Sequence, residues 1–355
     1  MPGPGPGIWA PGLWLGPVPR HAPTTAVDPV GTHHLSNGPW CLPFDEAGVL
    51  RWAQTVDLAL ASPRDQVTRL PLGPGVYRFR DTAGRVLYLG RAVCLRRRAA
   101  SYWGDLGDRP HLAAMVSRIA RVEAVPCDSA HEAAWLERNL LQRRKPPWNR
   151  SPSGGQESEV WIRLSSGERT PGLTVIRRPR TGEEARYFGP YLGGQKARDA
   201  VSGLGRVLPI GRAGALGAER ELARARGASP GLACTLTAVL DRDPAAVAAL
   251  RAELVRRRDA AAAALAFEFA GRVQAELEAL DWITAEQKVT SAQPDDFDVH
   301  GWAGGMLVRF EVRGGRLTGW TQRACPAAAS PPGDDGPAWA DFARRTAELA
   351  ALLAR

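Results

Sequence analysis

The pattern of apolar and polar positions predicts two short strands joined by a tight turn near residue 80. Residues 76–80 and 85–89 are rich in β-branched and aromatic side chains in partial alternation, as strands with one buried face are. Residues 81–84, Asp-Thr-Ala-Gly, end in a glycine able to take the positive φ of a hairpin turn. We therefore expect a β-hairpin here.

A hairpin closed symmetrically around this turn places Tyr77 opposite Tyr88 and Arg80 opposite Arg85. Opposed residues on antiparallel strands lie roughly 5 Å apart on one face, so two phenols would converge there. Taken alone, the hairpin favours an ordinary cross-strand aromatic pair in a protein core over a functional pair.

Helical patterns and a third strand follow the hairpin. Residues 92–102 predict a short basic helix, residues 111–120 a second helix, and residues 122–126 a strand. Ser129 and Glu132 have the spacing of a capping box, so a helix begins there and runs through the sequence AAWLERNLLQRR. It ends before the Lys-Pro-Pro sequence, because proline supplies no amide donor.

The rest of the chain predicts an α+β fold class with several small units. The sequences VWIRL and LTVIRR have strand patterns, and a helix is expected after the glycines of YFGPYLGG. A long alanine-rich helical pattern precedes two or three short strands with a turn at RGGR. The expected division is a disordered tail at 1–45, a first domain at 70–150, an α+β segment at 157–212, a helical region at 244–290, a small β segment at 295–322 and a terminal helix at 337–355.

The amino-terminal segment carries few structural signals. Residues 1–45 are crowded with proline and glycine, which is typical of a disordered tail, and residues 46–61 have helical spacing. The segment lacks the basic start and continuous apolar core of a secretory signal, and no later stretch reaches transmembrane length. We therefore expect a soluble, cytoplasmic protein.

Charge and cysteine content narrow the choice of partner and cofactor. A formal net charge of +9 indicates a polyanionic partner such as nucleic acid, although the excess of arginine and alanine also fits the coding bias of a GC-rich genome. The five cysteines stand singly, without a Cys-x-x-Cys pair. This spacing supports neither a disulfide framework nor a zinc site.

Several side chains together offer the chemistry of phosphodiester hydrolysis. Glu137 can hold one hard divalent cation through oxygen, and such a cation stabilises charge on phosphate and the leaving oxygen. Arg98 can bind a phosphate bidentately, and Arg91, seven residues earlier, shares its helical face if the helix already includes Arg91. A phenol can orient or deprotonate water, but a base role requires neighbouring cations to lower a pKa normally near ~10.

Each of these residues, taken singly, has an ordinary structural explanation as a surface arginine, a solvated glutamate or a turn asparagine. In combination they resemble the GIY-YIG nuclease superfamily, with GVY at 75–77 and YLG at 88–90 for its two tripeptides. The sequences LPLGPGVYRFRDTAGRVLYLGRAVCLRRRAASYW and EAAWLERNLLQRRKPPWN resemble the amino-terminal nuclease half of UvrC, the incision subunit of bacterial nucleotide excision repair.

The resemblance implies a small domain with a three-stranded antiparallel sheet flanked by helices. It implies that Glu137 binds one Mg²⁺ or Mn²⁺, that Arg98 clamps the phosphate and that Asn149 orients other groups. Either Tyr77 or Tyr88 could serve the attacking water. The functional positions implied by the resemblance are Tyr77, Tyr88, Arg98, Glu137 and Asn149, with Arg91 in place of a family lysine.

The resemblance continues beyond the nuclease domain, with departures. The segment around YFGPY is similar to the UvrC segment after its nuclease domain, and residues 265–283 resemble the helical UVR motif that engages UvrB. Gln274 and Ala275 replace the usual arginine–aspartate pair, so an ordinary amphipathic helix stays an open alternative. Only Cys234 remains of the cysteine set of UvrC, so we expect no iron–sulfur cluster.

The sequence therefore favours a metal-dependent endonuclease that acts on damaged duplex DNA, with UvrA- and UvrB-type repair proteins as partners. The chain stops near where UvrC would begin its second nuclease, which implies a single incision. The alternative is a non-catalytic DNA-binding or partner-docking protein that retains the fold. A stand-alone restriction or mobile-element nuclease fits less well, because it leaves the YFGPY segment and residues 265–322 unexplained.

Overall fold

The structure is a computed structural model. It describes residues 61–355 apart from residues 105, 107–109, 151–156, 166–171, 181, 183–184, 213–230 and 326–335. The expected disordered tail, and all but the last residue of the expected helix at 46–61, lie outside the described residues.

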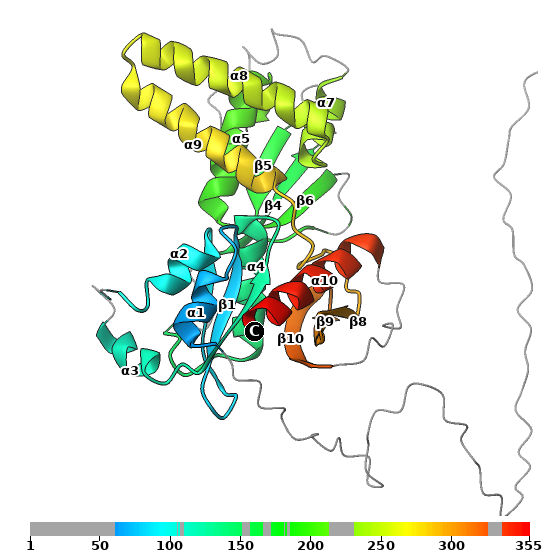
Figure 1. The fold of residues 1–355 in the computed structure, drawn as a ribbon. Coiled ribbons are helices and arrows are strands. Elements are labelled where there is room, and N and C mark those ends of the chain that lie inside the picture. Colours follow the sequence, from blue (N-terminus) through cyan, green and yellow to red (C-terminus); the bar gives the residue numbers. More distant parts are fainter. Residues whose placement is uncertain are drawn as a thin grey trace, which may run out of the picture. The chain divides into compact units, whose positions relative to one another are not determined.

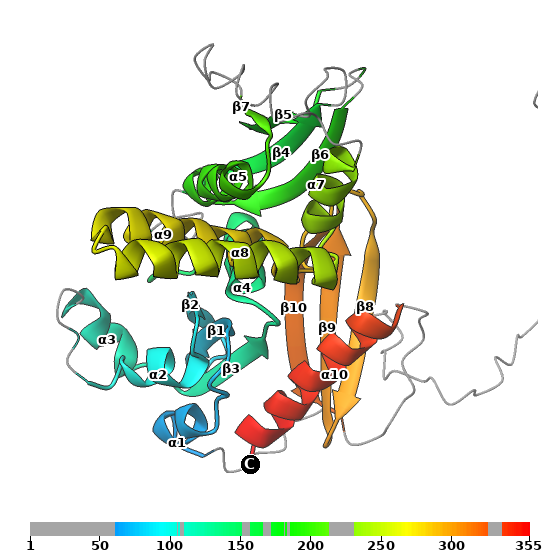
Figure 2. The same ribbon diagram turned by 90° about the horizontal axis from the view of Figure 1, so that it is seen from above.

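Figure 1 shows the first sheet among its helices, and Figure 2 labels its three antiparallel strands, which follow the order β2-β1-β3. This finding confirms the expected α+β class with a three-stranded antiparallel sheet flanked by helices. The strands are β1 (Gly75–Arg80), β2 (Val86–Ala92) and β3 (Arg121–Pro126). The helices around them are α1 (Pro63–Thr68), α2 (Leu95–Ala100), the 3₁₀ helix η1 (Pro110–Leu112), α3 (Ala113–Val116) and α4 (Ala130–Arg143).

The predicted hairpin register was wrong. Arg80 lies opposite Val86 and not Arg85, a difference of one residue, and the difference at the two tyrosines is two residues. Tyr77 lies opposite Gly90, and Tyr88 lies opposite Phe79, because an irregularity between Phe79 and Arg80 shifts the ladder. A shift of two preserves the alternation of faces in a strand. The two phenols therefore still lie on one side of the sheet, as a diagonal pair instead of a direct one.

Helix α4 begins with the predicted cap. The Ser129 hydroxyl accepts a hydrogen bond from the main-chain N–H of Glu132 at 2.9 Å. The Glu132 carboxylate accepts from the main-chain N–H of Asp128 at 2.8 Å, one residue earlier than a standard capping box requires. The cap fixes the start of the helix that carries Glu137.

A second sheet, in the order β6-β4-β5-β7, follows the first domain. Its strands are β4 (Glu159–Ser165), β5 (Gly172–Ile176), β6 (Ala185–Leu192) and β7 (Gly211–Arg212). The associated helices are α5 (Gly194–Val207), α7 (Leu232–Leu240), α8 (Pro244–Ala263) and α9 (Phe267–Thr284). The long helical pattern is thus two helices, which turn back on each other at Leu265, where φ is 58° (Figure 2).

A third sheet, in the order β10-β9-β8, completes the described chain. Its strands are β8 (Phe297–Ala303), β9 (Met306–Arg313) and β10 (Arg316–Ala324), and helix α10 (Gly336–Leu353) packs along them (Figure 2). The predicted turn at RGGR is made by Gly314 and Gly315, whose φ values of 57° and 70° suit glycine. Among the residues described, no helix is both long and apolar enough to cross a bilayer.

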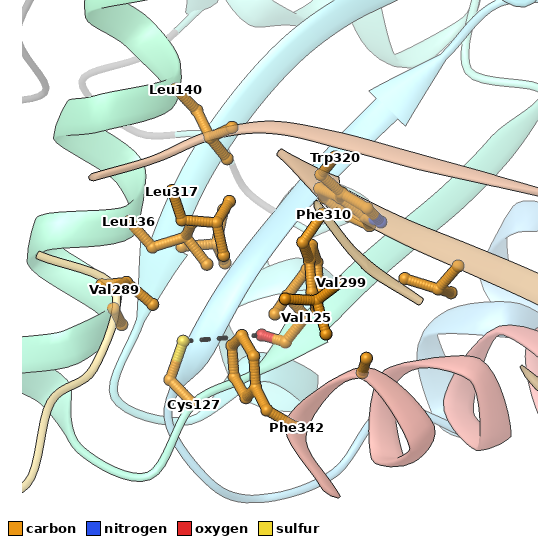
Figure 3. Close-up of a cluster of buried hydrophobic side chains, with 14 of the residues drawn as sticks. Val125, Cys127, Leu136, Leu140, Val289, Val299, Phe310, Leu317, Trp320 and Phe342 are labelled. Carbon is orange, nitrogen blue, oxygen red and sulfur yellow. Dashed lines mark hydrogen bonds between the residues drawn. The ribbon is translucent and has the colours of Figure 1, made fainter. Parts of the chain in front are cut away.

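One hydrophobic core joins the first and third sheets (Figure 3). Leu136 and Leu140 of α4 meet Leu317 and Trp320 of β10, and Phe342 of α10 lies in the same cluster. A buried arginine reinforces the junction. Arg78 of β1 pairs with buried Glu123, donates to the carbonyl of Trp320 at 2.8 Å and lies 3.7 Å from the Trp320 ring centroid.

Candidate active site

Three tyrosines meet on the face of the first sheet that α2 covers. Tyr77 comes from β1, Tyr88 from β2, and Tyr102 from the turn that follows α2. The hydroxyls of Tyr77 and Tyr102 lie 2.8 Å apart, within hydrogen-bonding distance. The ring centroids of Tyr88 lie 6.3 Å from Tyr77 and 5.7 Å from Tyr102. Tyr102 was not among the predicted site residues.

Gly90 makes room for this cluster. A Cβ atom at position 90 would lie 2.7 Å from the Tyr77 hydroxyl oxygen and 2.8 Å from Cε1 of Tyr88. Distances this short are not tolerated by packed atoms, so any larger residue would displace a phenol. The glycine of the YLG tripeptide is therefore required by close approach of the two tyrosines.

The three phenols are neutral in this environment. Burial raises the pKa of Tyr77 and of Tyr88 above the usual 10, and it raises the pKa of Tyr102 in the same direction. Arg98 opposes each of these shifts, but its effect is smaller than that of burial. The lowered pKa that a tyrosine base requires is not found here, so these hydroxyls are suited to donate hydrogen bonds and orient other groups.

The two arginines of the predicted phosphate clamp occupy different elements. Arg98 lies in α2, with its guanidinium carbon 5.8 Å from the Tyr102 ring centroid. Arg91 lies in β2, because the helix begins only at Leu95. The condition under which Arg91 and Arg98 would share a helical face, that the helix already includes Arg91, is therefore not met. Each arginine instead borders a different part of the site, Arg98 the phenols and Arg91 the carboxylate.

Glu137 projects from the middle of α4 toward β2, with only 7% of its surface exposed. Oε1 accepts a hydrogen bond from the main-chain N–H of Arg91 at 3.1 Å, and Oε2 lies 3.4 Å from Nε of the same residue. Burial raises the pKa of Glu137 from 4.5 to about 7, although both contacts with Arg91 oppose the shift. The contacts with Arg91 thus offset only part of the cost of burying the ionised carboxylate.

The carboxylate environment fits a hydrated Mg²⁺ or Mn²⁺ better than a metal enclosed by protein ligands. Among the described residues, no group of three or more His, Cys, Asp or Glu side chains could hold a metal ion. Mg²⁺ retains several waters and commonly binds through one or two carboxylates together with substrate phosphate. An incompletely compensated, buried carboxylate at Glu137 offers that kind of ligand.

A second carboxylate, absent from the predicted site, lies beside Arg91. Glu157 precedes β4, and its carboxylate oxygens lie 3.2 and 3.3 Å from Nη2 and Nη1 of Arg91. Its main-chain carbonyl accepts from Nη1 of Arg138 at 2.6 Å. No local pattern predicts this contact, because residues 151–159 have the composition of a linker.

Asn149 acts on the backbone of β2. Its Oδ1 accepts from the main-chain N–H of Leu89 at 3.0 Å, and its Nδ2 donates to the carbonyl of Leu89 at 2.7 Å. The side-chain amide therefore binds the strand at the residue between Tyr88 and Gly90. Asn149 is thus placed to hold the strand that carries Tyr88 and Arg91, which is consistent with an orienting role.

The structure thus brings Tyr77, Tyr88 and Arg98 together around the added Tyr102, and it joins Arg91 to Glu137. Asn149 is hydrogen-bonded to the main chain of β2 at Leu89, between Tyr88 and Gly90. A signal for Tyr102 is present in the sequence. It follows Arg98 by four residues, about one helical turn, which is a spacing that brings two side chains together.

Comparisons with known proteins identify a family and several relatives that this chain resembles. A family model described as the UvrC-like GIY-YIG domain matches residues 73–150. The UvrABC system protein C of Geobacter metallireducens is 36% identical over 148 residues, which cover 41% of this chain and 24% of that protein. The protein of the same name from Chlorobaculum tepidum is 31% identical over 294 residues, covering 75% and 45%. The chain spans less than half the length of these relatives.

A solved structure is also similar over the first domain. The GIY-YIG N-terminal endonuclease domain of UvrC from Thermotoga maritima, in a crystal structure bound to magnesium, is 28% identical, with a TM-score of 0.23. The match covers 24% of this chain and 93% of that chain.

Proposed function

We propose, from the UvrC-like GIY-YIG family to which residues 73–150 belong, that this chain is a metal-dependent endonuclease that makes a single incision in damaged or distorted DNA. The observation that carries the proposal is the placement of the buried Glu137 carboxylate beside β2, the strand that also presents Tyr88 to the phenol cluster. A protein that only binds DNA gains nothing from a buried carboxylate whose burial cost its neighbours offset only in part.

In the proposed reaction, water attacks a backbone phosphorus atom and the phosphodiester bond breaks. Tyr88 orients the water, because it is the only one of the three clustered tyrosines that is not fully buried. The hydrogen bond between Tyr77 and Tyr102 keeps the cluster rigid behind it. Arg98 neutralises charge on the phosphate, as guanidinium groups do in bidentate contacts.

Glu137 would hold one Mg²⁺ or Mn²⁺, whose charge, when bound, stabilises the phosphate and the leaving oxygen. Arg91 keeps the Glu137 carboxylate in place through its main-chain N–H. Only Cys234 stands where relatives of this type carry a cysteine set, so the proposed cofactor is this cation alone, without an iron–sulfur cluster.

The proposed substrate is duplex DNA that a lesion has distorted, and the proposed setting is the cytoplasm. The net charge of +9 supports a polyanionic substrate, since cationic side chains gain affinity by releasing counterions from phosphates. UvrA- and UvrB-type proteins are the proposed partners, because relatives carry the name UvrABC system protein C. The helical hairpin of α8 and α9 contains the UVR-like residues 265–283 and is the proposed contact for UvrB.

One observation favours the alternative of a non-catalytic DNA-binding or docking protein. Both Glu137 oxygens already face Arg91, and Arg91 is also bound by Glu157. A carboxylate that served only to pair with an arginine would look similar. Salt-sensitive DNA binding without metal-dependent incision would favour this alternative.

Incision of a defined lesion-bearing duplex, with and without UvrA and UvrB, tests the proposal. We expect one nick per duplex in Mg²⁺ or Mn²⁺, none in excess EDTA, and recovery when Mg²⁺ is restored. Glu137→Ala should lose incision. Full incision by this variant, or by the wild-type protein in EDTA, would refute the assignment.

A further inference from the structure

The outer edge of the Arg91 guanidinium is bound by the carboxylate of Glu157, which lies outside residues 73–150, the range matched by the family model. Both terminal nitrogens of Arg91 face Glu157, at 3.2 and 3.3 Å, one oxygen to each nitrogen. The third nitrogen, Nε, faces Glu137 at 3.4 Å. Arg91 therefore offers its two-pronged edge to Glu157 and its inner edge to the catalytic carboxylate.

This arrangement is the one that arginine uses for phosphate. A guanidinium binds carboxylates and phosphates through two parallel N–H···O bonds, because both anions present two oxygens at similar spacing. The Glu157 carboxylate occupies the place that two non-bridging phosphate oxygens would take. Both partners are partly exposed, with 31% of the Arg91 side chain and 40% of the Glu157 side chain accessible, so a phosphate can reach them.

Glu157 is held in position by contacts that do not involve its carboxylate. Arg138 of α4 donates to the main-chain carbonyl of Glu157 at 2.6 Å. Two residues later, the main chain of Glu159 already pairs with Leu192 in the ladder of β4 and β6. The entry to β4 is thus anchored on both sides, which keeps the Glu157 carboxylate at Arg91 while leaving that one ion pair free to exchange.

We propose that Glu157 occupies a backbone-phosphate subsite on Arg91 and that DNA must displace it to bind productively. The proposal rests on the proposed function, because it requires DNA as the ligand. Glu157 then lowers the affinity of the protein for DNA of any kind. Incision is confined to DNA whose phosphate binds Arg91 tightly enough to displace the Glu157 carboxylate. Exposed ion pairs are weak, so displacement adds a modest threshold and does not block the site.

Equilibrium binding to a fluorescein-labelled duplex in EDTA, followed by anisotropy, tests the proposal without cleavage. Glu157→Gln removes the charge but keeps the shape, so we expect its Kd for DNA to fall about twofold to fivefold. Glu159→Gln is the matched control, since it makes the same charge change on the same segment but leaves Arg91 untouched. Its Kd should stay within about 1.5-fold of wild type.

A double-mutant cycle separates displacement from a general change in charge. In an Arg91→Ala background, Glu157→Gln should have no further effect on Kd, because the subsite is already gone. In Mg²⁺, incision by Glu157→Gln at low DNA concentration should rise in step with affinity, while the rate at saturating DNA stays unchanged.

Three results would overturn the proposal. They are equal effects of Glu157→Gln and Glu159→Gln, a persisting effect of Glu157→Gln in the Arg91→Ala background, and weaker binding by Glu157→Gln. The last result would mean that Glu157 holds Arg91 in place for DNA. A wild-type protein that binds DNA but never incises it would refute the proposed nuclease function. The binding measurements on the Glu157 and Arg91 variants would still decide the role of Glu157, because they are made in EDTA.

Discussion

At the scale of single residues, the site is built from close contacts among side chains that the sequence holds apart. Tyr77, Tyr88 and Tyr102 depend on one another for position, since one hydroxyl pair is hydrogen-bonded and all three rings are in contact range. Gly90 is the residue that permits this packing. A test of the cluster therefore does not need to alter any of the tyrosines.

Gly90→Ala should strongly reduce incision, because its Cβ would lie 2.7 Å from the Tyr77 hydroxyl oxygen. We expect incision to fall by about tenfold or more and stability by about 1–3 kcal/mol, the usual cost of overpacking. The measurements are single-turnover incision and urea denaturation. Gly73→Ala is the matched control, since a Cβ there meets no atom within 4 Å. Equal activity of the two variants would show that the phenol positions do not matter.

The residues of the two tripeptides were predictable because their types and spacing are local properties of the chain. The residue that lies opposite each of them in the sheet was not predictable. The hairpin register depended on an irregularity between Phe79 and Arg80 that no turn residue signals, and the tyrosine pair survived only because the shift was even. The roles of Arg98, Glu137 and Asn149 stay predictions, since the structure gives their places and not their chemistry.

At the scale of elements, the site depends most on strand β2 and on helix α4, whose Glu137 is hydrogen-bonded to that strand. Strand β2 carries Tyr88 and Arg91, and it is held at Leu89 by Asn149 and at Arg91 by Glu137 of α4. The first turn of α4 also contacts the second sheet. His131 accepts a hydrogen bond from the main-chain N–H of Leu192 through Nε2, at 3.3 Å.

His131 should make the fold sensitive to acid. Burial lowers its pKa from 6.5 to about 3 in the folded protein, and the charges of Arg242 and Lys196 act in the same direction. Below pH 6.5 the unfolded chain binds a proton that the folded protein does not, so stability falls as pH falls toward 3. The contribution of His131 to this loss between pH 7 and pH 4 should be on the order of 3 kcal/mol.

Urea denaturation of wild type and His131→Gln at pH 7 and pH 4 checks this prediction. Glutamine keeps an acceptor for the Leu192 N–H but cannot gain a proton in this range. The variant should therefore lose less stability on acidification than the wild type. Identical losses would show that His131 does not titrate between the folded and unfolded states.

At the scale of the whole molecule, the first and third sheets share one core. Phe342 of α10, fully buried, packs with Phe310 of β9 at a ring-centroid distance of 5.1 Å, in the cluster that contains Leu136 of α4. Hydrophobic patterning predicted the strands and helices of both parts but not their junction. Arg78 and Trp320 are far apart in sequence, and local patterns carry no information about such pairs.

Phe342→Ala should therefore destabilise the first domain, which carries the candidate site. We expect a loss of about 3–5 kcal/mol, as for buried phenylalanines elsewhere, with the first and third sheets unfolding in one transition because they share one core. Phe269→Ala, at a side chain with 39% exposure on α9, is the matched control and should cost less than about 1 kcal/mol. Calorimetry checks both. Two separate transitions, with the one that abolishes incision unshifted, would show that the third sheet does not support the site.

The proposed metal-binding role of Glu137 is tested most directly by single-turnover incision of a lesion-bearing duplex in Mg²⁺, with wild type and Glu137→Gln compared. The substitution preserves an oxygen acceptor for the Arg91 main-chain N–H, so β2 should keep its place, while the negative charge for the cation is lost. We expect the rate to fall by about a hundredfold or more, with an unchanged unfolding midpoint. A folded Glu137→Gln protein that incises at the wild-type rate would contradict the proposed role.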